Sequence, residues 1–113
     1  MIRTRERTSH MARTIAYATP EERATARALQ ELPNIGPAMA HDLMRLGIDS
    51  ADQLATRDPD ELYAALCALD GATHDPCVLD TFMAAIDAAR GLPARPWWDY
   101  TPLRKARQAE RST

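Results

Sequence analysis

The residues that decide the fold of this chain read Leu32-Pro33-Asn34-Ile35-Gly36-Pro37-Ala38-Met39-Ala40. Helical signals lie on both sides of this stretch, and the turn between them is rich in proline, asparagine and glycine. A turn this short has no room for structure of its own. The pattern therefore predicts two helices joined by a tight hairpin.

Three residues of the turn have expected conformations. Asn34 tolerates the left-handed backbone region better than other common non-glycine residues. Gly36 suits a positive φ or the close approach of another group. Pro37 suits the first position of the second helix, where a missing N–H costs nothing. The free N–H groups at that helix start carry a partial positive charge, so they are expected to be able to hold a phosphate.

The stretch resembles the helix-hairpin-helix motif of DNA-binding proteins. The family's sequence of apolar, glycine and alanine positions falls on Leu32, Asn34, Ile35, Gly36, Ala40 and Leu43. Asn34 departs from the pattern, which has its first glycine there. DNA-binding copies also place a basic or polar residue just after the second glycine, where this chain has Pro37, Ala38, Met39, His41 and Asp42.

The resemblance implies a phosphate site that needs no side-chain chemistry and reads no sequence. The residues that would hold the phosphate are Asn34, Ile35, Gly36, Pro37 and Ala38. Asp42 would repel a phosphate that lay near it. The alternative is that the hairpin packs the core or contacts a protein partner.

Start and stop signals divide the middle of the chain into five helices, expected at about 20–31, 37–46, 51–55, 59–70 and 76–90. Thr19 and Ser50 begin capping boxes, and Gly47 suits a left-handed helix end. The last helix has the widest apolar stripe and is expected to be the most buried. No strand-like alternation of useful length occurs. With the resemblance, this predicts an all-α, compact five-helix helix-hairpin-helix domain of the SAM-like type over residues 19–91.

The two ends are expected to be flexible. Residues 1–18 show no clear period and are predicted to form a disordered or extended arm. Residues 92–113 begin with a proline-rich segment, expected to be extended, and continue as a basic tail, expected to fray. Met11 is an alternative start to Met1.

The chain has 113 residues, enough for one small domain with tails. It has no run of about 18 apolar residues, so no membrane association is expected. The polar, basic beginning shows no secretory signal, so a cytoplasmic location is expected.

The net charge of −2 hides a split along the chain. Residues 1–30 carry +3, residues 31–91 carry −8 and residues 92–113 carry +3. Because nucleic acid attracts basic groups, the tail residues Arg104, Lys105 and Arg107 are predicted to add affinity for DNA. The alternative is a solvated tail.

Further motifs follow the hairpin in order: Leu62-Tyr63, Leu66-Cys67, Asp75-Pro76-Cys77-Val78-Leu79, Phe82 and Trp97-Trp98. With the hairpin they resemble the small bacterial helix-hairpin-helix proteins of the pathogenicity-locus or mitomycin-resistance-like family. The hairpin is also similar to the C-terminal helical domains of TfoX-type competence regulators. The resemblance implies the fold and a link to DNA, and it assigns no reaction.

A zinc site has weak support. Cys67, His74 and Cys77 are good ligands, but neither a C-x-x-C nor a paired-histidine spacing occurs. Asp75 is better explained as a helix N-cap. No metal or other cofactor is predicted, and both cysteines are expected to be small buried residues on facing helices.

The aromatic residues near the end, Trp97, Trp98 and Tyr100, allow two interpretations. They stack on unpaired bases or fill a partner's pocket, or at least one tryptophan folds back to close the core. Tyr63 is expected to be half-buried.

Catalysis has little support, because most acids lie at helix starts and no Gly-rich nucleotide loop occurs. The sequence therefore predicts a non-enzyme that binds DNA backbone phosphates without sequence specificity. The alternative is a protein-interaction adaptor that uses the hairpin or the Trp97-Trp98 segment.

Overall fold

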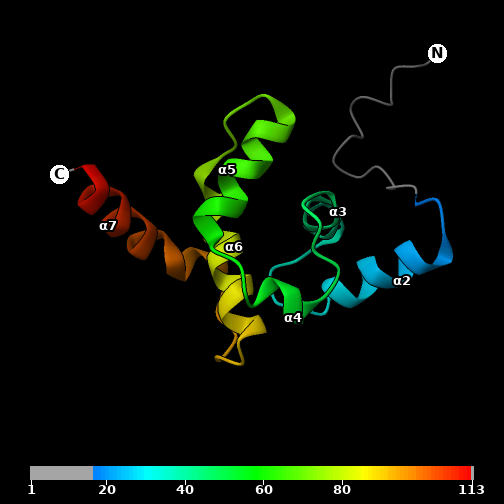
Figure 1. The fold of residues 1–113 in the computed structure, drawn as a ribbon. Coiled ribbons are helices and arrows are strands. Elements are labelled where there is room, and N and C mark those ends of the chain that lie inside the picture. Colours follow the sequence, from blue (N-terminus) through cyan, green and yellow to red (C-terminus); the bar gives the residue numbers. More distant parts are fainter. Residues whose placement is uncertain (1–16, 113) are drawn as a thin grey trace, which may run out of the picture.

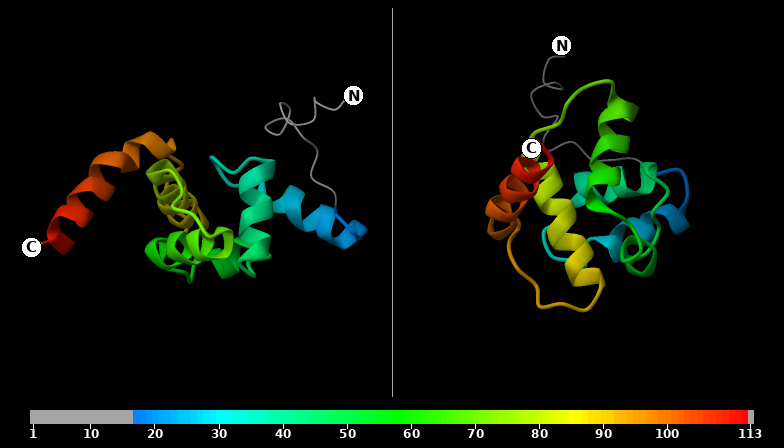
Figure 2. Two further views of the ribbon diagram at one scale, coloured as in Figure 1. Left: turned by 90° about the horizontal axis from the view of Figure 1, so that it is seen from above. Right: turned by 60° about the vertical axis from the view of Figure 1, so that its left-hand side comes forward.

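A computed structural model of the chain describes residues 17–112, which are all-helical and contain no strand. The elements are α2 (Pro20–Leu29), α3 (Pro37–Arg45), α4 (Ala51–Leu54), α5 (Pro59–Asp70), α6 (Pro76–Ala89), the 3-10 helix η2 (Trp97–Tyr100) and α7 (Thr101–Ser112). Figure 1 shows α2 and α7 at opposite ends of the molecule, and Figure 2 confirms this from two further sides. The predicted all-α class is confirmed.

The five expected helices begin and end within two residues of their predicted bounds. Side-chain caps mark the starts of four of them. Thr19 and Glu22 form the capping box of α2, in which the Glu22 amide donates to the Thr19 hydroxyl at 3.1 Å. Ser50, Asp58 and Asp75 cap the three helices that follow α3. Each cap satisfies a backbone N–H that the helix itself leaves without a partner.

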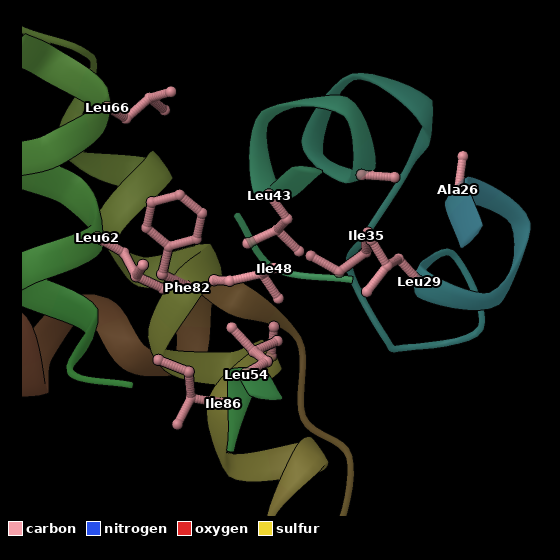
Figure 3. Close-up of a cluster of buried hydrophobic side chains, with 12 residues drawn as sticks. Ala26, Leu29, Ile35, Leu43, Ile48, Leu54, Leu62, Leu66, Phe82 and Ile86 are labelled. Carbon is pink, nitrogen blue, oxygen red and sulfur yellow. The ribbon is translucent and has the colours of Figure 1, made fainter. Parts of the chain in front are cut away.

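Helix α6 forms the centre of the core, as expected from its apolar stripe. Its residues 79–86 are all buried. In Figure 3, Phe82 of α6 lies between Leu62 of α5 and Ile48, which follows α3. Leu43 and Ile35 continue this cluster toward α2. The hairpin side chains and the α5–α6 side chains therefore share one core.

The turn between α2 and α3 differs from expectation at one residue. Asn34 has φ +70°, as predicted, but Gly36 has φ −91° and ψ −173°, which is extended backbone. A Cβ added at Gly36 would meet no atom within 4 Å. The positive φ expected for Gly36 as one alternative is therefore wrong, and no atom of the described residues approaches it closely. Gly47 has φ +84° at the end of α3, as predicted.

The C-terminal segment also differs from expectation. Residues 97–100 form a 3-10 helix and Thr101–Ser112 form α7, where an extended segment and a fraying tail were predicted. The carboxylate of Asp80 on α6 holds this helix: Arg104 Nε donates to Asp80 Oδ1 at 2.6 Å, and the Thr101 hydroxyl donates to Oδ2 at 2.7 Å. Buried ionic hydrogen bonds of this kind fix α7 on the core.

Most of the expected N-terminal arm, residues 1–16, lies outside the described residues. Tyr17, within the predicted arm, is half-buried against the core and lies edge-on to His41 of α3, with ring centroids 5.9 Å apart. At the other end of the chain, only Thr113 lies outside the described residues.

Candidate nucleic-acid interface

The start of α3 presents bare backbone N–H groups. Gly36 is its N-cap, and no side chain accepts a hydrogen bond from this end. The groups left without a helical partner are the N–H groups of Gly36, Ala38 and Met39, since Pro37 has none. Gly36, Pro37 and Ala38 are exposed. This end of α3 therefore carries an accessible partial positive charge.

The starts of the other helices from α2 to α6 are capped by side chains. Thr19, Ser50, Asp58 and Asp75 each accept a hydrogen bond from the first turn of α2, α4, α5 and α6. Asp75 illustrates the effect, because its bond from the Cys77 amide lowers the pKa of its carboxyl group. Among α2 to α6, α3 alone lacks a side-chain cap, and its first turn holds no acid.

The acid that would repel a phosphate has a basic partner. Asp42 lies in the second turn of α3 and accepts a hydrogen bond from Arg45 at 3.1 Å. Arg45 also pairs with Asp70 of α5, and this contact lowers the pKa of the Asp70 carboxyl group. Arg45 is thus shared by two carboxylates and offsets only part of the charge of Asp42.

Asn34 connects the hairpin to a distant part of the chain. Its side-chain amide donates to the Arg95 carbonyl at 2.9 Å, and its side-chain oxygen accepts from the Trp97 amide at 3.3 Å. We call residues 92–98 the strap. The residue that replaces the first glycine of the motif therefore clamps the strap onto the turn, a contact that the sequence pattern did not reveal.

The aromatic residues divide between core and surface. Tyr100 is buried, and its hydroxyl donates to Asp87 at 2.8 Å. Trp97 packs, half-buried, on the cluster that contains Leu79 and Tyr100, which confirms that one tryptophan folds back. Trp98 stays exposed on the strap. Tyr63 is half-buried, as expected.

The basic residues of α7 do not join the hairpin. Arg104, predicted to contact DNA, is instead buried and paired with Asp80, which argues against a contact with a phosphate. Arg107 pairs with Asp60 of α5, and Arg111 reaches the same carboxylate at 2.7 Å. Lys105 is exposed, but α7 lies at the end of the molecule opposite α2 (Figure 1). Three of the basic residues of α7 are thus held by carboxylates of α5 and α6.

Cys67 and Cys77 lie half-buried on α5 and α6. The His74 amide donates to the Cys67 sulfur at 3.4 Å, while the His74 ring pairs with Asp70 at 2.7 Å. Burial raises the pKa of the Cys77 thiol, which favours its protonated form. Residues 17–112 contain no group of three or more side chains placed to hold a metal ion.

A cleft of about 590 Å³ separates α7 from α6 and the loop before α5. Its lining includes the buried side chains of Met83, Ile86 and Tyr100. Three arginines and three acids also line it: Arg57, Arg90, Arg107, Asp58, Asp87 and Glu110. This balance favours neither an anionic nor a cationic ligand.

Comparison with known proteins places the chain in a family. The model of the family described as Cdd1, pathogenicity locus, matches residues 22–106. The chain belongs to this family. It is also 53% identical over 77 residues to the protein named mitomycin resistance protein McrB of Streptomyces lavendulae, a match that covers 68% of this chain and 73% of the relative. No solved structure matches the chain.

The match to this family confirms the family resemblance drawn from the hairpin and the motifs after it. The matched region includes the hairpin, the strap and the first half of α7. None of the helices described is both long enough and apolar enough to cross a membrane.

Proposed function

We propose that this protein is a non-catalytic module that binds the phosphate backbone of DNA without sequence specificity. One observation carries the proposal: the start of α3 is exposed and uncapped, whereas α2, α4, α5 and α6 each carry a capping side chain. A helix start of this kind offers two or three N–H donors to one phosphate oxygen. The resemblance of the turn to the helix-hairpin-helix motif supports the same ligand.

A site of this kind should have a small affinity for DNA, and that affinity should depend on the salt concentration. Backbone donors position a phosphate but read no base. The α7 arginines add little to the site, since Arg104, Arg107 and Arg111 are all paired with carboxylates. We therefore expect binding that weakens several-fold for each doubling of salt, with a slope that corresponds to only a few phosphates.

The replacement Gly36→Asp tests the site directly. The backbone at Gly36 suits any residue, and an added Cβ meets open space. Aspartate would cap α3 and stabilise it by about 0.5–1 kcal/mol, while its charge would repel a phosphate. We expect urea denaturation to show higher stability and anisotropy with labelled duplex DNA to show at least about tenfold weaker binding.

Gly36→Asn is the matched control, because asparagine also caps the helix but carries no charge. It should give a smaller loss of affinity than Gly36→Asp. Equal DNA binding by the wild type and the Gly36→Asp variant would exclude the start of α3 as the binding site.

The relative's name refers to mitomycin resistance. If this chain shares that role and acts through DNA, cells that produce the wild-type protein should survive mitomycin better than cells that produce the Gly36→Asp variant. Equal protection by both proteins would separate resistance from the hairpin.

A protein-interaction adaptor is the second candidate, favoured by the acidic region 31–91 and by the exposure of Trp98. Exposed tryptophans contribute strongly to protein interfaces. Capture of partners from a lysate with and without nuclease distinguishes the two functions. Partners that remain after nuclease treatment, and that the Trp98→Ala variant fails to capture, would favour the adaptor.

A further inference from the structure

Trp98 is presented to solvent from a fixed base. Its side chain is 60% exposed, the highest value among the large apolar residues described. Its ring meets the half-buried Trp97 ring edge-on, with centroids 5.6 Å apart and planes at 83°. Trp97 in turn packs on the cluster that contains Leu79 and Tyr100. Trp97 therefore anchors the strap, and Trp98 presents an exposed ring that contacts the Trp97 ring.

The strap is tied to the hairpin at the turn itself. Pro93 and Pro96 restrict its backbone, and Asn34 holds it through the two hydrogen bonds at 2.9 and 3.3 Å. The chain of bonds from Gly36 through Asn34 and Trp97 to the Cα atom of Trp98 spans at most roughly 20 Å. A few nucleotides of single strand cover that distance.

We propose that the hairpin and the strap form one composite site for unpaired DNA, in which a phosphate lies at the start of α3 and a nearby base stacks on Trp98. This inference rests on the proposed function and adds the class of DNA to it. Bases inside a duplex are already stacked on one another, so only an unpaired base can use the ring. Stacking on an aromatic ring accepts any base, in agreement with a site that reads no sequence.

The local charges permit a nucleic acid at the strap. Asp99, the acid next to Trp98, lies 3.5 Å from Arg95 Nε, so its repulsion of phosphate is partly neutralised. Arg95 also lies 5.0 Å from the centre of the Tyr100 ring. Asn34 is then a positioning residue, because it fixes the strap without contacting the base.

The experiment uses the full chain with three labelled DNAs of one sequence: a blunt duplex, the same duplex with a short single-stranded overhang, and the single strand alone. We expect wild-type protein to bind the overhang duplex more tightly than the blunt duplex. Trp98→Ala should remove this preference, with at least about fivefold weaker binding to the overhang duplex, and leave blunt-duplex binding unchanged. Leu69→Ala, which truncates another exposed apolar residue, is the control and should change neither.

Asn34→Gly tests the clamp. Glycine adopts the backbone conformation of φ +70° without strain, so the hairpin keeps its shape while the bonds to Arg95 and Trp97 are lost. We expect the preference for the overhang to fall, and the double variant with Trp98→Ala to bind no more weakly than Trp98→Ala alone. Circular dichroism confirms that each variant remains folded.

The outcomes distinguish failure of the composite site from failure of the proposed function. Blunt-duplex binding that depends on Gly36, together with no overhang preference or no effect of Trp98→Ala, would overturn the composite site and leave the proposed function intact. An overhang preference that survives Asn34→Gly would overturn the role of the clamp. No binding to any of the three DNAs at low salt would overturn both proposals.

Discussion

The hairpin end and the α7 end of the molecule differ in how their positive charge is used. At the hairpin the charge is the partial charge of free N–H groups at the start of α3, and no side chain of residues 17–112 caps it. On α7 the charge is formal and much larger, yet Arg104, Arg107 and Arg111 are all paired with carboxylates. The weaker charge is thus accessible, and much of the stronger one serves the fold.

This difference shows why counting charges along a sequence misplaces a binding surface. The carboxylates that pair with α7 come from Asp60 and Asp80, which are distant from it in the sequence. Two acids of the middle region are therefore the ion-pair partners of three arginines of the basic end. The helix start that the fold leaves uncapped is one positive feature that no carboxylate occupies.

Removing the buried carboxylate should give the largest effect. Asp80 is 1% exposed and receives hydrogen bonds from Arg104 and Thr101. Asp80→Ala leaves the Arg104 guanidinium buried without its charged partner, which costs about 3–5 kcal/mol of unfolding free energy. Urea denaturation followed by circular dichroism measures this loss. Lys105→Ala, an exposed neighbour on the same helix, should change stability by less than about 0.5 kcal/mol.

A loss for Asp80→Ala as small as that for Lys105→Ala would mean that α7 is attached by other contacts. The difference between the two ends would then be disproved, since the α7 arginines would not be needed to stabilise the fold.

Releasing the surface arginines should make the α7 end resemble a DNA-binding surface. Asp60 pairs with Arg107 and Arg111, and both arginines are partly exposed. Asp60→Asn frees their charge, with a stability loss of no more than about 1 kcal/mol. We expect tighter binding to duplex DNA and a salt slope steeper by about 1–2, because each freed arginine can neutralise a phosphate.

Asp52→Asn provides the matched control for this change. Asp52 is an exposed acid on α4, so the variant has the same net charge but releases no arginine. An equal change in salt slope for both variants would attribute the effect to net charge alone.

Local signals explain the part of the fold that the sequence predicts well. Thr19, Ser50, Asp58 and Asp75 each act on a backbone N–H within three residues, so the starts of four helices are readable from short stretches. Helix α7 begins with the same Thr-Pro pair as α2, but the Thr101 hydroxyl donates to Asp80 and no side-chain cap marks this start within its own short stretch. Its attachment depends on Asp80, 24 residues away from Arg104, and no short pattern encodes that distance.

The candidate site shows the same limit. The hairpin residues are recognisable from the sequence, but the pattern does not say which of Asn34 and Gly36 takes the left-handed conformation. It also cannot reveal that Asn34 bonds to Arg95, 61 residues later. The sequence feature that points to this contact is the asparagine in place of a motif glycine. Asparagine tolerates a positive φ, and its side-chain amide can bridge two backbone segments.

The smallest predicted effect is a change in stability with pH, which should differ between the capped helix starts and the uncapped start of α3. The hydrogen bond from the Cys77 amide lowers the pKa of the Asp75 carboxyl group. A folded-state pKa below the unfolded one gives a stabilisation that is present above about pH 4 and is lost as the pH falls through the folded-state value. Asp75→Asn keeps the cap but cannot titrate. The stability difference between wild type and this variant, measured by urea denaturation, should therefore disappear in acid.

Gly36→Asp should add a stabilisation with the same pH dependence at α3, where the wild-type helix start has no carboxylate. If the stabilisation gained from Gly36→Asp persisted below the folded-state pKa of the new carboxyl group, its charge would not be interacting with the helix start, and the positive character assigned to that end of α3 would be wrong.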